Sequence, residues 1–432
     1  MKSIFTKIVH QLIFRLYLLK KSKWMESHKI QWSSKHDIET LKLKKLKYIL
    51  HHAVNHVPFY YALKEKINFD EFSIEELYKF PIIDKSIIRA NFRSFLSTKN
   101  SGILSKTSGT SGEPFKYYLP FNSWAKEKIT YSRAWGMGKE YKYKVGDPVV
   151  MLRTYTPGPG DPIWCYNKKD NFYYLSAFHI NKDNLTLYVN IIERSKSKLL
   201  RGYGSSIYIF TLLLKEHNIR LSNINTIITS SEMLLSYQRE LIEEHFGVKV
   251  LDWYGQNENT VTVQQCWAGN YHNNDDYGIL EIDDNREIIA TSLNNDVMPF
   301  IRYNTKDKAI KLDTDIEECS CGRKLSIPFK GIEGRSDDIL IKKDGTLVPT
   351  ANFSTLMKTF DLIDQYQIIQ HENRDLTLKL ISRTEDSKYF ELIRKEYESR
   401  LGNIPIKIEL VKEIKRDLKT GKLKVSIQEG KI

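Results

Sequence analysis

The sequence is poor in cysteine, with 4 residues among 432. So few cysteines exclude a disulfide framework in a chain of this length, and they fit a reducing compartment such as the cytoplasm. Internal repeats and tracts of low complexity are absent too. The hydrophobic fraction of 41% still allows a sizeable core, which excludes a wholly disordered chain. The length predicts two or three domains.

The charge balance is strongly positive. Lys and Arg number 66 against 53 Asp and Glu, which gives a formal net charge of +13. Such a balance favours anionic partners, namely nucleotides, nucleic acid or an anionic membrane surface. The positive residues are spread along the chain, however, and no Lys/Arg block, zinc-finger or helix-turn-helix pattern occurs. We therefore expect no nucleic-acid partner.

Residues 1–23 have basic flanks and apolar side chains at helical spacing, which are Phe5, Ile8, Leu12, Leu16 and Leu19. This is no clean signal peptide, because His10, Gln11 and Arg15 interrupt the apolar run and no small-residue cleavage site follows. The segment is also too short and too polar to span a bilayer. It predicts an amphipathic helix that either packs on its own domain or lies on an anionic leaflet, at the inner face of the membrane.

The middle of the chain alternates between helix and strand patterns. Residues 37–96 have helical spacing that Pro58 interrupts, and residues 199–217 also predict a helix. "INTIITSS" predicts a strand, "SYQRELIEEHF" a helix that ends at Gly247, and "VKVLDWYG" another strand. This order predicts a βαβ unit in a mainly parallel sheet with helices on its faces. Ligands of such sheets bind outside the carboxyl ends of the strands, where "YGQNE" lies.

A different pattern follows "GRSDD". "ILIKKDGTLVPT" predicts a hairpin with an Asp-Gly turn, and two short strands, a helix over 387–401 and the strand "IPIKIELV" come after it. This is a compact α+β domain of roughly 95 residues. The predicted fold class is α/β, with a helical N-terminal part over 1–98, an α/β core over 99–335 and a small mobile domain over 336–432.

A cluster of hydroxyl residues and glycines occupies residues 107–112, before Glu113 and Pro114. Bare backbone amides and hydroxyls donate hydrogen bonds to anionic oxygens, so the cluster predicts a phosphate-binding loop, with a surface turn as the alternative. Neither the Walker A pattern nor the three-glycine dinucleotide fingerprint is present. These absences exclude the usual P-loop and nicotinamide-binding classes.

The cysteines raise the possibility of a metal. Cys266, His272, Cys319 and Cys321 supply three thiolates and an imidazole, a sufficient tetrahedral set for structural Zn²⁺. Only one residue separates Cys319 from Cys321, so buried free cysteines are the competing interpretation. Cys165 has no evident partner in the sequence.

Five motifs follow one another in order: "TSGTSGEP" at 107–114, "WYGQNE" at 253–258, "IRYNTKD" at 301–307, "GRSDD" at 334–338 and "TGKLKV" at 420–425. Together they resemble the adenylate-forming enzymes, specifically the phenylacetate–CoA ligase family and its CapK-like, capsular polysaccharide-associated branch. "YILHHAVNHVPFYYAL" is similar to the N-terminal helical signature of that family. The resemblance covers most of the chain and implies a layered α/β domain that binds ATP and a carboxylic acid, with a small C-terminal domain that swings to complete the site.

The resemblance also implies residue roles. By the resemblance, the β- and γ-phosphates are bound by Ser108, Gly109, Thr110, Ser111 and Gly112, and Thr110 is also catalytic. Glu258 is the Mg²⁺-associated carboxylate, and the adenine is surrounded by Tyr254, Gly255, Ser231 and Glu232. Asp307 and Arg335 reach the ribose, Asp337 is the hinge, and Lys422 bridges the acyl carboxylate and the α-phosphate. Outside their motifs, Glu258 and Asp307 would equally suit surface carboxylates, and other lysines surround Lys422.

The sequence departs from the family at two places. Lys306 precedes Asp307 where the family has glycine, so it could alter the backbone turn or contact a phosphate. Lys424 replaces an arginine often found two residues after the lysine. The CapK-like branch often carries a Cys…His…Cys-x-Cys set, which favours zinc at the four ligands named above.

The acid pocket is expected between the phosphate loop and the adenine strand, at Trp124, Arg133, Tyr203 and Ser206. Arg133 could pair with a second anionic group of the acid or cap a helix. The sequence identifies neither the acid nor the oligomeric state.

Three functions follow. The first is an ATP- and Mg²⁺-dependent ligase that forms an acyl-adenylate and transfers the acyl group to CoA or to another thiol or amine, in cell-surface polysaccharide biosynthesis. The second keeps adenylation but joins an amino or aryl acid directly to a sugar. The third is a basic, non-catalytic module that binds nucleotide or a membrane surface.

Overall fold

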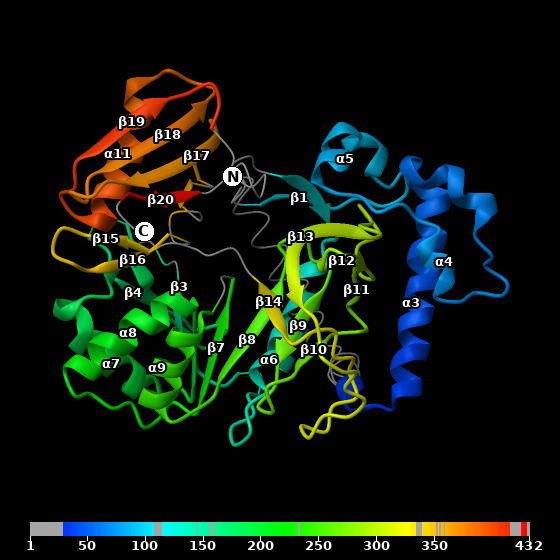
Figure 1. Cartoon of the computed structure of the whole chain (residues 1–432), viewed down its shortest axis with the longest axis horizontal. Helices are drawn as coiled ribbons and strands as arrows, with labels where there is room; N and C mark the ends of the chain where they lie inside the picture. Colours follow the sequence, from blue (N-terminus) through cyan, green and yellow to red (C-terminus); the bar gives the residue numbers. More distant parts are fainter. Residues whose placement is uncertain are drawn as a thin grey trace. The chain divides into compact units, whose positions relative to one another are not determined.

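The structure is a computed structural model of the whole chain, shown in Figure 1. It describes residues 29–107, 115–144, 146–153, 155, 157–158, 160–231, 234–333, 339–350, 353, 356–357, 359–414 and 425–429. The chain divides into two compact units. The first comprises 1–106, 116–145 and 251–334, and the second comprises 107–115, 146–250 and 335–432. None of the helices within the described ranges is both long and apolar enough to cross a membrane.

The first unit opens with helices: η1 (Ile30–Trp32), α3 (Lys35–His56), η2 (Pro58–Lys66), α4 (Glu75–Tyr78), α5 (Lys85–Ala90) and η3 (Phe92–Phe95). Helix α3 begins at Ser34, whose side chain accepts a hydrogen bond from the backbone N–H of Asp37. It ends before Pro58, because proline cannot continue the helical hydrogen bonds. The helical prediction for this region is confirmed, although several of the helices are short.

Antiparallel strands form the rest of the first unit, together with helix α6 (Ser123–Trp135). Strands β1 (Ile103–Lys106) and β2 (Lys116–Leu119) pair with each other, and β8 (Val250–Gly255), β9 (Thr262–Gln265) and β10 (Tyr271–Asn273) pair in succession. A four-stranded sheet contains β11 (Gly278–Ile282), β12 (Glu287–Ser292), β13 (Tyr303–Ile310) and β14 (Gly331–Glu333). One small core, with Val263, Ile288 and Phe329 among its members, joins β9 to the four-stranded sheet.

The second unit contains the predicted parallel sheet. Its elements are β3 (Val149–Arg153), β4 (Trp164–Asn167), β5 (Phe172–Ser176), η4 (Ala177–His179), α7 (Lys182–Ser195), β6 (Leu199–Gly202), α8 (Gly204–Glu216), β7 (Thr226–Ser230) and α9 (Ser236–Phe246). Strands β5, β3, β6 and β7 are parallel, and β4 pairs antiparallel with β5. Residues from α7, α8 and α9 form one buried core with the strands. The βαβ prediction is confirmed, and α9 ends at Gly247, whose φ of +68° is left-handed.

One prediction in this region is wrong. The helix expected over 199–217 is a strand over Leu199–Gly202 followed by α8 from Gly204 onward. Leu199 and Leu200 are fully buried at the centre of the sheet. A short apolar run of a central strand cannot be distinguished by its spacing from the first turn of a buried helix.

The C-terminal part of the second unit is the predicted α+β module. It contains β15 (Ile339–Ile341), β16 (Leu347–Pro349), β17 (Ile363–Gln370), β18 (Leu376–Ser382), α11 (Ser387–Leu401), β19 (Ile406–Leu410) and β20 (Ser426–Gln428). The hairpin of β15 and β16 turns at Gly345, which has a φ of +88°. The four-stranded sheet has the order β19-β18-β17-β20. The expected closing strand is β19, and β20 adds a further strand parallel to β17.

Candidate functional site

Two tyrosine–carboxylate hydrogen bonds join the end of β8 and its following loop to β13. The Tyr254 hydroxyl donates to Oδ2 of Asp307 at 3.0 Å, and the Tyr303 hydroxyl donates to Oε1 of Glu258 at 3.1 Å. Each segment therefore supplies one tyrosine and one carboxylate. The structure brings together Tyr254, Glu258 and Asp307 from two of the predicted motifs, and it adds Tyr303, which the sequence interpretation missed although it lies inside "IRYNTKD".

The loop that presents Glu258 is fixed by its own side chains. Oε1 of Gln256 accepts a hydrogen bond from the Thr260 hydroxyl at 2.7 Å, and the backbone N–H of Asn259 donates to the Gln256 carbonyl at 3.0 Å. Asn259 has a φ of +56°, a conformation that asparagine tolerates better than most residues. The chain thus reverses between β8 and β9 and leaves Glu258 buried, with 3% of its surface exposed.

Glycine is required at position 255 because the Trp253 ring lies close to the backbone there. A Cβ atom at this position would lie 2.8 Å from the ring of Trp253, closer than side-chain contacts normally come. The Trp253 ring can pack this closely against the backbone beside Tyr254 because residue 255 has no side chain.

Glu258 meets a lysine that the sequence interpretation did not single out. The Lys85 ammonium lies 3.2 Å from Oε1, the same oxygen that accepts the Tyr303 hydrogen bond. Lys85 is the first residue of α5, whose N-cap is Asp84. A buried carboxylate fits Mg²⁺, which takes one or two protein carboxylates beside phosphate and water.

The two carboxylates change the titration of their tyrosine neighbours. Burial, and then the charge of Asp307, raises the pKa of Tyr254 well above its usual value. Burial and the charge of Glu258 do the same for the pKa of Tyr303. Both hydroxyls therefore remain protonated and act as hydrogen-bond donors to the carboxylates throughout the neutral range.

Lys306, the departure from the family before Asp307, keeps the turn that glycine would make. Its φ is +63°, and its backbone N–H donates to the side chain of Asn304 at 2.8 Å. Its ammonium lies 3.0 Å from the carboxylate of Glu287. Lysine here leaves the backbone turn in place, and its charge is paired within the protein.

Two of the residues expected at the acid pocket lie on α6. Arg133 is buried, and its guanidinium donates to Asp276 at 2.7 and 2.9 Å and to Asn274 at 2.8 Å. This bidentate internal pair weighs against a role of Arg133 in recognising the acid, which stays a prediction. Trp124 is half-buried, and the ammonium of Lys128 lies 4.2 Å from its ring centre.

Tyr203, Ser206 and Ser231 belong to the second unit. Tyr203 is the N-cap of α8, and the guanidinium carbon of Arg153, at the end of β3, lies 5.6 Å from its ring centre. Ser206 is fully buried in the first turn of α8. Ser231 directly follows β7 and has a φ of +75°. These residues lie at the carboxyl ends of parallel strands, the edge at which such sheets bind ligands.

The remaining predicted site residues lie outside the described residues and stay predictions. They are Ser108, Gly109, Thr110, Ser111, Gly112, Glu232, Arg335, Asp337 and Lys422.

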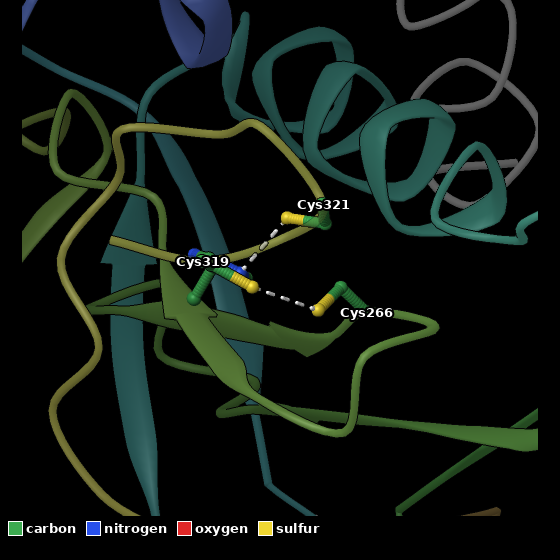
Figure 2. Close-up of side chains that lie close together, drawn as sticks. Cys266, Cys319 and Cys321 are labelled. Atoms are coloured by element: carbon green, nitrogen blue, oxygen red, sulfur yellow. Dashed lines mark hydrogen bonds between the residues drawn. The ribbon is translucent and has the colours of Figure 1, made fainter. Parts of the chain in front are cut away.

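The predicted thiol–imidazole set comes together in the first unit. The ligand atoms of Cys266, His272, Cys319 and Cys321 all lie within 4.8 Å of one another, and all four residues are buried. The Cys266 and Cys319 sulfurs are 3.6 Å apart, and the Cys321 sulfur lies 3.3 Å from Nε2 of His272. Figure 2 shows the sulfurs of the three cysteines pointing toward one another. A tetrahedral zinc with bonds of about 2.3 Å would separate its sulfur ligands by roughly 3.8 Å, so this set fits zinc.

Neighbouring groups orient this cluster. Nδ1 of His272 lies 3.3 Å from the Leu325 carbonyl, an arrangement that leaves Nε2 to face Cys321. The side-chain amide of Asn270 donates to the Cys319 sulfur at 3.2 Å. A hydrogen bond with Cys266, together with the nearby His272, lowers the pKa of Cys321 far below that of a free thiol. Cys165 belongs to the second unit, where it is half-buried on β4.

The chain is similar to known proteins over most of its length. Residues 340–429 match the CapK C-terminal domain. The chain is 23% identical to protein CapK of Staphylococcus aureus over 79% of this chain and 77% of that protein. It is 23% identical to phenylacetate-coenzyme A ligase of Aromatoleum evansii over 90% of this chain and 89% of that protein. The solved structure of 2-hydroxyisobutyryl-CoA ligase in complex with 2-HIB-AMP and CoA superposes with a TM-score of 0.57 at 18% identity, covering 93% and 91% of the two chains.

The fold is therefore that of the adenylate-forming CoA ligases, and the predicted fold class is confirmed. Within that class the chain resembles protein CapK and the phenylacetate-coenzyme A ligases, and it carries a CapK C-terminal domain.

Proposed function

We propose that this protein is an ATP-dependent acid ligase that releases AMP. In the first step a carboxylate oxygen of the acid attacks the α-phosphorus of ATP, the bond to the β-phosphate oxygen breaks, and an acyl-adenylate and pyrophosphate form. In the second step a thiol, such as that of CoA, attacks the acyl carbon, AMP leaves, and the thiol proton goes to solvent. Both steps need cationic and hydrogen-bonding groups around reacting oxygens.

The observation that carries this proposal is the pair of reciprocal tyrosine–carboxylate hydrogen bonds. They hold Asp307 and Glu258 in fixed places on one unit, as a ribose acceptor and a metal-associated carboxylate require. Tyr254 and Gly255 lie beside Asp307, where the adenine would stack. Bound Mg²⁺ would reduce the repulsion between the phosphates and the incoming carboxylate. Lys85 would hold Glu258 in place through Oε1.

The residues outside the described ranges complete the proposal from the sequence. Residues 108–112 would bind the β- and γ-phosphates, Glu232 would lie under the adenine, Arg335 would contact the ribose, and Asp337 would serve as the hinge. Lys422 would bridge the two reacting oxygens. Peripheral membrane contact through the N-terminal segment also stays a prediction.

The proposal has two more specific parts. One is structural zinc at the thiol–imidazole cluster, and the other is an acyl acceptor in cell-surface polysaccharide biosynthesis. Four protein ligands leave no open position, so the metal would have a structural role. The polysaccharide assignment is supported by the CapK relative and the CapK C-terminal domain. CoA as acceptor is supported by the phenylacetate-coenzyme A ligase relative.

The test is acid-dependent exchange of labelled pyrophosphate into ATP, against aryl, short-chain, sugar and amino acids. Exchange with one class of acid is expected, and Asp307→Asn should lower the affinity for ATP by about tenfold, because it removes a charged acceptor of hydrogen bonds. Glu258→Gln and Lys422→Ala should reduce exchange further. Asp313→Asn, at an exposed carboxylate paired with Lys330, is the matched control that should leave it unchanged.

ATP binding, measured by calorimetry without an acid, separates the alternatives. Binding without exchange would mean that the panel lacks the acid and would leave the nucleotide site supported. If the protein neither binds ATP nor catalyses exchange, but binds anionic liposomes in a salt-sensitive way, the ligase proposal is wrong and a basic binding module takes its place.

A further inference from the structure

One aromatic side chain from the 146–250 segment lies in the hydrophobic core of the C-terminal part. Phe178, in η4, is 2% exposed and belongs to a cluster of buried residues whose other members all lie between Leu340 and Ile406. Both segments belong to the second unit. The C-terminal core is therefore completed by a residue that lies far from it in the sequence.

The contacts of Phe178 are specific. Its ring centre lies 5.9 Å from that of Phe353 in an edge-to-face arrangement, and Phe353 stacks on Tyr397 at 4.7 Å. On another side, the guanidinium carbon of Arg400 lies 4.9 Å from the Phe178 ring centre. Phe178 thus makes both an aromatic contact and a cation–π contact, and both are buried, where such contacts are strongest.

Arg400 depends on this ring. It is 2% exposed, and its Nη1 hydrogen-bonds to Glu396, while Nε and Nη2 have no hydrogen-bond acceptor within the described part of the chain. The face of the Phe178 ring thus stabilises the part of the buried Arg400 guanidinium that makes no hydrogen bond. Without the ring, the guanidinium would have to reach water or another anion.

The short helix η4 is held firmly on its own side. The Tyr188 hydroxyl, on α7, donates to the carbonyl of Ser176 at 2.7 Å, and the side-chain amide of Asn184 donates to the carbonyl of His179 at 3.1 Å. Phe178 lies between these two anchored carbonyls. It therefore projects from a fixed support into the C-terminal core, where Val348 of β16 and Phe353 surround it.

We propose that Phe178 is a positioning residue that docks the C-terminal part on the β5–α7 connection in one of the positions that this part takes during the reaction. This inference rests on the proposed function and on the swinging C-terminal domain that the family resemblance implies. Leaving the docked position requires Phe178 to be withdrawn and Arg400 to be uncovered. The balance between docked and released positions is then set by this contact.

Hydrogen exchange of the full chain without any substrate tests docking directly. Phe178→Ala should speed amide exchange by about tenfold or more in the peptides 348–357 and 396–401, which contain Val348, Phe353 and Arg400, while residues 376–382 inside the C-terminal sheet keep their protection. Phe178→Leu, which restores most of the apolar volume, should show a smaller effect. Ile192→Ala, on the buried face of α7, is the control that removes a buried side chain of the same unit outside the core that contains Phe178.

Unchanged exchange at 348–357 in Phe178→Ala would overturn the proposal. Equal deprotection of 376–382 would also overturn it, because Phe178 would then serve only the folding of the C-terminal part. Phe178→Leu decides the matter if the alanine variant fails to fold. Since exchange needs no acid or CoA, a failure of docking is distinct from a failure of the ligase proposal, which pyrophosphate exchange tests separately.

Once the acid substrate is identified, Phe178→Ala should raise the rate of one half-reaction and lower the rate of the other. Pyrophosphate exchange reports adenylation, and release of AMP from a synthetic acyl-adenylate by CoA reports transfer. We expect the ratio of the two rates to shift by about tenfold in Phe178→Ala, because only one position is weakened. An equal fall in both rates would contradict a positioning role.

Discussion

At the scale of single residues, Lys306 shows how a change from the family pattern can be accommodated. Its φ of +63° costs a non-glycine residue about 1 kcal/mol, and the exposed pair with Glu287 returns only a fraction of that. Lys306→Gly should therefore leave the free energy of unfolding within about 0.5 kcal/mol and leave ATP affinity unchanged.

Lys306→Val is the contrasting variant, and it should destabilise the protein by about 1 kcal/mol or more, because a β-branched residue is poorly tolerated in the left-handed region. Denaturant unfolding and nucleotide titration of the two variants measure these effects. A large loss of ATP affinity in Lys306→Gly alone would mean that the lysine contacts a phosphate.

Gly255 gives the second prediction at this scale. Gly255→Ala would place a methyl group 2.8 Å from the Trp253 ring, and relief requires a shift of the ring or of β8. We expect a loss of about 1–3 kcal/mol in stability and weaker ATP binding, since Tyr254 is the adjacent residue. Gly331→Ala is the matched control, because its Cβ would meet only the flexible end of Ile310 at 3.3 Å. Equal stabilities of the two variants would contradict the steric argument.

At the scale of elements, the thiol–imidazole cluster connects the β9–β10 hairpin to the segment before β14. Cys266 and His272 belong to the hairpin region, and Cys319 and Cys321 to the segment that leads to Phe329. The Phe329 ring packs edge-on against Tyr254, with ring centres 6.2 Å apart. A metal at the cluster would thus stabilise the support of the tyrosine that holds Asp307.

Purified protein should accordingly contain about one zinc per chain, and a strong chelator should lower the melting temperature by several degrees. Cys266→Ser should lose the metal and the chelator effect together. Cys165→Ser, which alters the cysteine outside the cluster, should keep both. Protein that is free of zinc and indifferent to chelator would show that the four residues are buried without a metal.

His179 makes the docking element sensitive to pH. Burial lowers its pKa below the ordinary value, and the charges of Lys342 on the β15–β16 hairpin and Arg400 on α11 lower it further. The docked state therefore prefers neutral His179, while a released His179 takes up a proton near pH 6.5. Docking should be fully stable above about pH 7 and should weaken as the pH falls below about 6.5.

The measurement is hydrogen exchange at residues 348–357 between pH 5.5 and 7.5, corrected for intrinsic rates. Faster corrected exchange at the lower pH is expected, and His179→Asn should abolish this dependence. His217→Asn, on the same unit at the end of α8, is the control that should keep it. A pH dependence that survives in His179→Asn would assign the effect to another group.

At the scale of the whole molecule, the sequence predicted local elements and motif neighbours better than long-range assembly. The helix over 387–401, the Asp-Gly hairpin and the βαβ unit follow from spacing and turn residues, and the motifs indicated Tyr254, Glu258 and Asp307. Lys85 and Phe178 were missed because their partners lie far along the chain, and no local pattern indicates such contacts. The predicted mobile domain over 336–432 stays a prediction, and the contacts group that part with residues 146–250.

This grouping leads to a prediction about cooperativity. If the C-terminal part and residues 146–250 form one unit through Phe178, they should unfold together in a calorimetric scan of the wild-type protein. Phe178→Ala removes buried packing from the contact between the two segments. The C-terminal part should then melt in a separate transition at lower temperature. Ile393→Val, which weakens the C-terminal core from within, should move the joint transition without splitting it. If Phe178→Ala also only moves the transition, the two segments are coupled mainly by other contacts, such as the packing of β16 against α8.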